Sequence, residues 1–160
     1  MSKLKSFKDL IVWQVSSELA KDISTKLVLH FPKYERYKLG DQIIRSSRSV
    51  PSQIAEGFRK SSLKEKHRFY EIAVTSNDET ENHMIEAKNN QYIDAQTYKR
   101  YMNRVIRVRI LLLRLMKSVR FLQDEVAARS ASPRRKAPKT ASGKKMPYRS
   151  VGAIRKRNRG

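Results

Sequence analysis

Apolar residues recur at alternating steps of three and four along the second half of the chain. They are Tyr98, Tyr101, Val105, Val108, Leu112, Leu115, Val119 and Leu122. This spacing places all of them on one stripe of an α-helix and does not match the two-residue period of a β-strand. Asp94 precedes the stripe at a position suited to capping a helix N-terminus. The pattern therefore predicts one long amphipathic helix that begins near residue 95.

Three earlier segments follow a similar period. The first extends from about residue 7 to 29, and the second from about 39 to 58 with Pro51 in its interior. The third begins at Ser62-Leu63-Lys64-Glu65, which matches the capping-box pattern. Its inner stripe consists of Phe69, Ala73, Ser76, Thr80, His83 and Ala87. Because this stripe is small and partly polar, we expect neighbouring helices to approach closely there and share hydrogen bonds.

The distribution of glycine, proline and charge divides the chain into two parts. Residues 1–128 contain only two glycines and two prolines, which favours long helices. We therefore predict an all-α fold for residues 1–128, an antiparallel up-down-up-down four-helix bundle. Residues 129–160 contain twelve of the 36 Lys and Arg residues and no acid. This basic tail has too few apolar residues for a core, so we predict that it is disordered when free.

Composition and motifs argue against several kinds of active site. The chain has no cysteine, which excludes disulfides, thiolate zinc sites, iron–sulfur centres and a cysteine nucleophile. No acid lies between Ala95 and Gln123, which excludes the carboxylate di-metal site of ferritin-like bundles. No nucleophile motif accompanies His30, His67 or His83, and no glycine-rich phosphate loop occurs. We therefore expect no catalysis and no metal or cofactor.

Some polar residues of the helical segments admit more than one interpretation. His83 lies on an apolar stripe, where a hydrogen-bonded core histidine is more common than a ligand. Four neighbouring acids could hold a metal, but more commonly such residues form a solvated face or ion pairs with nearby arginines. These acids are Asp78, Glu79, Glu81 and Glu86. Arg45 and Glu56 are candidates for a pair between helices or subunits.

The charge indicates the kind of partner. A net charge of +21 and a pI near 10.5 favour polyanions such as nucleic acid. The longest aliphatic run, residues 110–113, is far too short to span a membrane, and the N-terminus lacks a secretion signal. We therefore expect a cytoplasmic protein. The basic tail lacks the apolar face that would anchor it to a membrane, so we expect no membrane binding.

Two groups of cations are candidates for contacts with phosphate. A basic ridge beside the apolar stripe of the fourth segment consists of Arg100, Arg104, Arg107, Arg114 and Lys117. The alternative for the ridge is a solvated face partly neutralised by acids of the third segment. The tail contributes Arg134, Arg135, Lys136, Lys139, Lys144, Lys145, Arg155, Lys156, Arg157 and Arg159. Since the chain has neither a recognition-helix pattern nor an aromatic RNA-binding motif, we expect weakly sequence-specific binding.

Several short motifs resemble those of a known family. They are Phe7-Lys8-Asp9-Leu10, Val12-Trp13-Gln14, Phe31-Pro32, Tyr37-Lys38-Leu39, Ser49-Val50-Pro51-Ser52, Ile54-Ala55-Glu56-Gly57-Phe58 and Phe69-Tyr70-Glu71-Ile72-Ala73. From about residue 5 to 120 the chain resembles the four helix bundle protein family, bacterial proteins first noticed in intervening sequences of large-subunit rRNA genes. It departs from the family pattern at Gln53, where Asn is usual, and at Thr75, where a smaller residue is usual. The change at Thr75 could alter a tight contact between helices.

The resemblance implies an antiparallel four-helix bundle that assembles as a ring-shaped homopentamer. It also implies kinship with the accessory variability determinant of diversity-generating retroelements, a basic pentamer that binds nucleic acid and a reverse transcriptase. We therefore expect a non-catalytic, oligomeric module that binds structured RNA or an RNA–DNA hybrid. The alternative is an accessory adaptor of a reverse transcriptase in such a retroelement.

Overall fold

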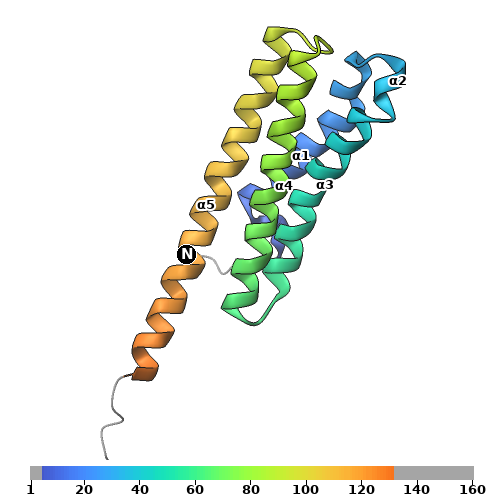
Figure 1. Cartoon of the computed structure of the whole chain (residues 1–160). Coiled ribbons are helices and arrows are strands. Elements are labelled where there is room, and N and C mark those ends of the chain that lie inside the picture. Colours follow the sequence, from blue (N-terminus) through green and yellow to red (C-terminus); the bar gives the residue numbers. More distant parts are fainter. Residues whose placement is uncertain (1–4, 132–160) are drawn as a thin grey trace, which may run out of the picture.

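The computed structural model describes residues 5–131, and four long helices account for most of them (Figure 1). These helices are α1 (Ile11–Thr25), α3 (Leu39–Arg59), α4 (Leu63–Asn89) and α5 (Ala95–Ala131). A 3₁₀ turn, η1 (Phe7–Asp9), precedes α1, while η2 (Leu27–His30) and the one-turn helix α2 (Lys33–Arg36) connect α1 to α3. No strand occurs in residues 5–131. The predicted all-α fold is confirmed.

The long helices alternate in direction and form an antiparallel bundle (Figure 1). α3 packs against α1 and α4, and α5 packs against α4 and α1. The connections are short, with residues 60–62 between α3 and α4 and residues 90–94 between α4 and α5. Short connections make consecutive helices antiparallel neighbours, which gives the up-down-up-down order expected from the sequence.

The capping residues expected for two helices are present. The side chain of Ser62 accepts a hydrogen bond from the backbone N–H of Glu65, at the start of α4. Asp94 accepts one from the backbone N–H of Thr97 at 2.6 Å, and this bond lowers the pKa of the Asp94 carboxyl. Both side chains satisfy N–H groups that lack a partner within the first helical turn.

The first helix is shorter than predicted. We expected one helix from about residue 7 to 29, but α1 spans Ile11–Thr25 and 3₁₀ turns flank it. An α-helix advances about 100° per residue, so a continued helix would turn Val28 roughly 140° away from Ile23. With the change to η2, Leu27, Val28 and Phe31 are all buried in the core cluster instead. Burial of these side chains therefore overrides the helical period at this point.

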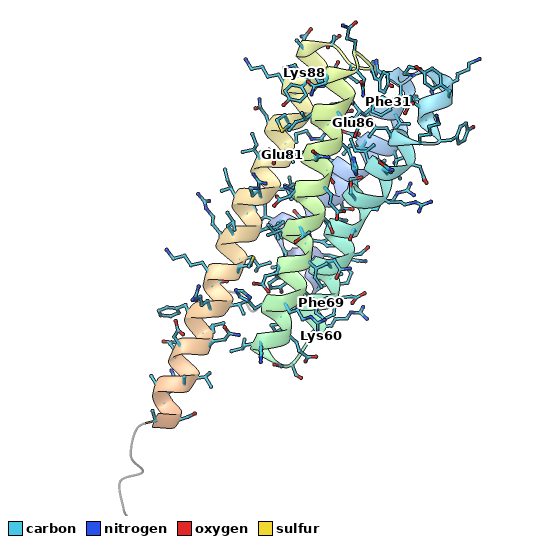
Figure 2. All side chains as sticks on the ribbon, viewed as in Figure 1. Phe31, Lys60, Phe69, Glu81, Glu86 and Lys88 are labelled. Atoms are coloured by element: carbon cyan, nitrogen blue, oxygen red, sulfur yellow. The ribbon has the colours of Figure 1, made fainter. Side chains whose placement is uncertain are left out.

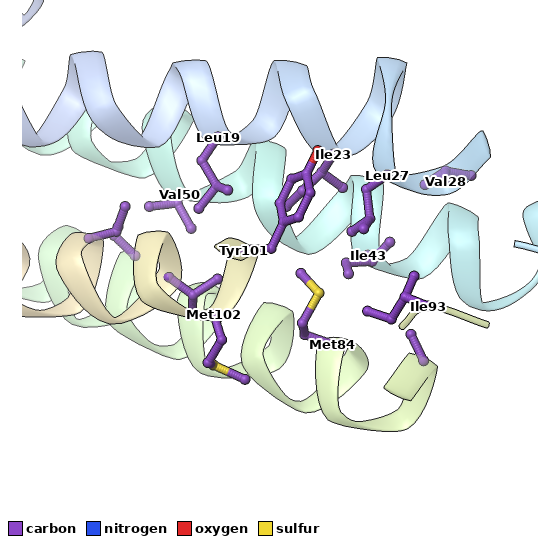
Figure 3. Packing of buried hydrophobic residues seen from close by; sticks show 14 of the residues in the cluster. Leu19, Ile23, Leu27, Val28, Ile43, Val50, Met84, Ile93, Tyr101 and Met102 are labelled. Carbon is purple, nitrogen blue, oxygen red and sulfur yellow. The ribbon is translucent and has the colours of Figure 1, made fainter. Parts of the chain in front are cut away.

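The core is apolar along most of its length. Figure 3 shows Leu19 and Ile23 of α1, Ile43 and Val50 of α3, Met84 of α4 and Tyr101 of α5 meeting in one cluster. Of these, Ile23, Ile43 and Met84 are completely inaccessible to solvent. All four long helices contribute to this cluster, so the bundle has a single core.

Small polar residues fill the interface between α3 and α4. The hydroxyl of Thr80 donates to Ser46 Oγ at 2.9 Å, and the hydroxyls of Ser49 and Ser76 lie 2.9 Å apart. Asn77, which is 1% exposed, donates to the backbone carbonyl of Val105 in α5 at 3.2 Å. The predicted close approach with shared hydrogen bonds is therefore confirmed.

The segment Ile54-Ala55-Glu56-Gly57 has a packing role at the same interface. A Cβ atom added to Gly57 would lie 2.6 Å from the ring of Tyr70, which is buried on α4. The ammonium of Lys66 donates to the carbonyl oxygen of Phe58 at 2.6 Å, at the C-terminal end of α3, and burial lowers the pKa of Lys66. The missing side chain of Gly57 therefore lets α4 approach α3 closely, and the hydrogen bond from Lys66 joins the two helices at this point.

Three expectations about single residues change with the structure. Thr75 is exposed and its hydroxyl donates to the Glu71 carbonyl, so it disturbs no contact between helices. Arg45 pairs with Asp41 on its own helix, and Glu56 is exposed with no ion pair to any residue in 5–131. Neither residue therefore pairs with another helix within residues 5–131, and a pair between subunits stays a prediction.

His83 also differs from its expected role. It is half-buried, and its Nδ1 atom is buried without a hydrogen-bond partner among residues 5–131. The prediction of a hydrogen-bonded core histidine is therefore wrong for this nitrogen. The buried face of α4 contains the neighbouring residue Met84 in place of His83, and Met84 is completely buried.

Candidate nucleic-acid interface

The apolar stripe of α5 faces the other helices along most of its length. Tyr101, Val105, Val108, Leu112 and Val119 are buried, as the spacing predicted. The stripe ends differently, because Leu122 is 46% exposed. Figure 1 shows the reason: the C-terminal part of α5 projects beyond the ends of the other helices. Apolar side chains on this part, such as Leu122 and Val126, are therefore left exposed.

Arg104, one of the five predicted ridge residues, forms an ion pair between helices. Its Nη1 atom lies 2.7 Å from Oδ2 of Asp22 in α1. Lys26 contacts the same carboxyl at 2.8 Å, and hydrogen bonds from Lys26 and Arg104 lower the pKa of Asp22. The charge of Arg104 is therefore compensated, and this residue joins α5 to α1.

Arg109, which the sequence reasoning missed, makes the corresponding contact on the other side of α5. Its Nε atom donates to Oδ1 of Asp78 at 3.0 Å, and Nη2 lies 3.1 Å from Oε2 of Glu81. Both acids belong to α4, and Figure 2 labels Glu81 there. The hydrogen bond to Asp78 raises the pKa of Arg109. The ion-pair interpretation of the acidic cluster is confirmed for Asp78 and Glu81.

The other ridge residues are exposed and uncompensated. Arg100, Arg107, Arg114 and Lys117 have no ion pair with any residue in 5–131. Arg100, Arg107 and Arg114 recur every seven residues, so they lie on one line along the helix, roughly 10 Å apart. Arg120 is also exposed and unpaired within the described part, although we did not single it out from the sequence. Because residues three apart are neighbours on a helix surface, its position three residues after Lys117 could have assigned it to the same basic surface.

Two shallow hollows adjoin these cations near the projecting end of α5. One, of about 460 Å³, is lined by Arg114, Lys117, Ser118, Phe121 and Leu122. The other, of about 220 Å³, is lined by His67, Leu113, Met116, Lys117 and Arg120. Each places guanidinium or ammonium groups beside apolar side chains. Such surfaces attract anions by charge and can also cover an apolar part of the same partner.

The ten candidate residues of the tail, from Arg134 to Arg159, lie outside the described residues. The described helix α5 continues to Ala131, past the domain boundary that we expected after residue 128. The structure therefore gives the position of the ridge, and contacts between the tail and nucleic acid stay a prediction.

The remaining chemistry within residues 5–131 is limited. No three of their His, Asp and Glu side chains are grouped so that they could hold a metal ion. His67 lies 3.5 Å from Glu71 on the next turn of α4, and this is the arrangement of an ordinary surface pair. Over the same residues, no helix combines the length and the apolar character needed to cross a membrane.

Comparisons with known proteins agree with this architecture. A family model described as 23S rRNA-intervening sequence protein matches residues 8–114, well over half of the chain. A search of curated proteins finds no match. Among solved structures, a protein of unknown function from the S23 ribosomal protein family of Bacteroides thetaiotaomicron has a TM-score of 0.62 and 24% identity. The match covers 67% of this chain and 99% of that one, and it supports the bundle fold.

Proposed function

This chain belongs to the 23S rRNA-intervening sequence protein family, and from that premise we propose that it is a non-catalytic, oligomeric module that binds nucleic acid in the cytoplasm. The ligand is structured RNA or an RNA–DNA hybrid, held mainly through its phosphates. The observation that carries the proposal is the line of uncompensated cations on α5.

The geometry of this line suits a polyanion. From Arg100 to Arg114 the helix rises about 21 Å, which is long enough to follow several phosphates of one strand. Three acids of the neighbouring helices that contact α5 are already engaged, since Asp22 binds Arg104, and Asp78 and Glu81 bind Arg109. The ridge cations therefore keep their charge for an external partner.

The tail and the assembly strengthen the same interaction. Twelve cations without an acid in residues 129–160 cannot neutralise one another. In a homopentamer, the form that the family resemblance implies, five ridges and five tails act on one ligand. Several weak contacts then combine into tight binding through a high effective concentration.

A salt-titrated anisotropy series tests the proposal. We would compare the wild-type chain with a triple variant carrying Arg100→Gln, Arg107→Gln and Arg114→Gln, on a hairpin RNA and an RNA–DNA hybrid. For every phosphate that the variant no longer binds, the slope of log K against log [salt] should flatten by about 0.7 to 0.9. The matched control removes three exposed lysines from other surfaces, with Lys8→Gln, Lys21→Gln and Lys64→Gln. No binding by the wild-type chain, or equal slopes for both variants, would contradict the proposal.

A second candidate function is an adaptor for a reverse transcriptase of a diversity-generating retroelement. The apolar side chains on the projecting end of α5 favour it, because Phe121 is 62% exposed and Val126 is 55% exposed. Exposed apolar groups of this size are typical of protein docking surfaces. Co-purification with such an enzyme, abolished by Phe121→Ser but retained by the Arg triple variant, would support this function over direct nucleic-acid binding.

A further inference from the structure

Two tyrosines are highly exposed at the end of the bundle where η2 and α2 lie. The side chain of Tyr37 is 88% exposed and that of Tyr34 is 64% exposed. Together with Leu29, which is 60% exposed, they follow one another within nine residues of the chain. This segment is separate from the basic ridge of α5, so the ridge does not account for the exposure of its tyrosines.

The segment that carries the tyrosines is held in a fixed shape. Arg36 donates from Nη2 to the Leu29 carbonyl at 2.8 Å and from Nε to the Phe31 carbonyl at 3.0 Å. Phe31 is 1% exposed, and its ring centroid lies 5.8 Å from that of Tyr92 in the α4–α5 connection. Figure 2 labels Phe31 at this end of the molecule. The tyrosines are therefore presented by an anchored turn, and ordering them costs little when a ligand binds.

The charges around the rings favour an anionic partner. The ammonium of Lys38 lies 5.9 Å from the centroid of the Tyr34 ring. Lys33 and Lys38 are exposed and have no ion pair with any residue between 5 and 131. The one acid of α2, Glu35, is half-buried on the side of Tyr92, whose pKa is raised by burial and by Glu35. Two exposed aromatic rings and two cations without ion pairs thus share the six residues 33–38.

We propose that Tyr34 and Tyr37 form a stacking platform for unpaired bases, with Lys33 and Lys38 contacting the phosphates on either side. This inference rests on the proposed function and names its substrate class as single-stranded segments, such as the loops of a structured RNA. Tyrosine stacks on any base, so the platform adds affinity without reading the sequence. Bases inside a duplex already stack on each other, and the platform therefore distinguishes unpaired from paired nucleic acid.

The test uses the full-length chain and two probes of equal charge. One is an oligouridine RNA, and the other is an abasic RNA of the same length, which keeps the phosphates and lacks the bases. Tyr34→Ala and Tyr37→Ala should each weaken binding to oligouridine about tenfold, and binding to the abasic RNA should be unchanged. Tyr34→Phe and Tyr37→Phe should bind within about twofold of the wild type, because phenylalanine keeps the stacking face. Ile11→Ala removes a comparably exposed apolar side chain, 61% exposed, from α1 and away from the α5 cations, and it is the matched control.

A second measurement reports stacking directly. An oligonucleotide containing 2-aminopurine should lose fluorescence on binding the wild type and lose less on binding the alanine variants. The salt slope should be unchanged by either tyrosine substitution and should flatten in Lys33→Gln and Lys38→Gln.

The outcomes separate the platform from the wider proposal. If the wild type binds oligouridine and the alanine variants bind it equally well, the platform is wrong and the proposed function stands. If the wild type binds neither probe, both fail. If the alanine variants lower the mass of the assembly in light scattering and weaken both probes equally, the tyrosines belong to an interface between copies of this chain.

Discussion

The two parts of α5 have the same apolar spacing but very different surroundings. Between Tyr101 and Val119 the stripe is buried against the other helices. Beyond Val119 the helix continues to Ala131, yet Leu122 and Val126 remain 46% and 55% exposed. The periodic pattern thus specifies a helix and its apolar face, while burial depends on how far the neighbouring helices extend.

The cations of α5 also differ in their surroundings, but according to the face of the helix on which they lie. In the packed part, Arg104 and Arg109 pair with acids of α1 and α4. Toward the projecting end, Arg114, Lys117 and Arg120 have no such partner among residues 5–131. Arg104 and Arg109 therefore help to hold the bundle together, whereas the cations on the outer face of α5, in the packed part as well as near the projecting end, present their charges to solvent.

The largest expected difference between the two parts of α5 is how much a Leu→Ala substitution lowers the free energy of unfolding. Leu112 is completely buried, so Leu112→Ala should lower the free energy of unfolding by about 2–5 kcal/mol. Leu122→Ala should change it by less than about 0.5 kcal/mol, because solvent already reaches this side chain. Urea denaturation of both variants measures the difference. Similar losses for the two would mean that the projecting end is covered in solution.

The next effect concerns the polar contact that joins α4 to the packed part of α5. Asn77→Ala removes the hydrogen bond to the Val105 carbonyl and leaves a small cavity, which should cost about 1–2 kcal/mol. Asn103→Ala, an exposed change on α5 itself, is the matched control and should be nearly neutral. An Asn77→Ala variant as stable as the control would show that the contact is dispensable.

A smaller effect, with a defined pH dependence, is expected at the ion pair between α1 and α5. Asp22→Asn should lower the free energy of unfolding at pH 7 by about 1 kcal/mol. The pKa of Asp22 is lowered in the folded state, so its contribution is full above the ordinary value of 3.8 and is lost as the pH falls through the folded-state pKa. The stability curves of wild type and variant should therefore converge in acid. Parallel curves down to pH 2 would contradict this role.

Much of the fold followed from the sequence because its signals are local. The spacing of the α5 stripe and the caps at Ser62 and Asp94 depend on residues one or two turns apart. The end of α1 could not be predicted in this way, because the residues after it pack against other elements: Val28 lies beside Gly40 of α3, and Phe31 lies beside Tyr92 between α4 and α5.

The candidate site was predicted less completely for a related reason. The spacing placed Arg104 beside the stripe, but its partner Asp22 lies on α1, 82 residues away. Arg109 was missed because nothing near it in sequence marks it, although its acids were recognised as possible partners of an arginine. Spacing on one helix identifies which cations share a face, whereas their neutralisation depends on how helices pack.

The smallest expected effect on folding tests what covers the projecting end of α5. Phe121→Ser combined with Leu122→Ser should leave the melting temperature of the dissociated single chain within about 2 °C, because both side chains are already exposed there. If this end packs against a neighbouring subunit of the proposed pentamer, the double variant should show a lower mass in light scattering. We expect that decrease, because an exposed phenylalanine and leucine beside Val126 form an apolar surface that association would remove from water. An unchanged mass would place the subunit contacts on the other helices and leave the end of α5 free to dock a different protein.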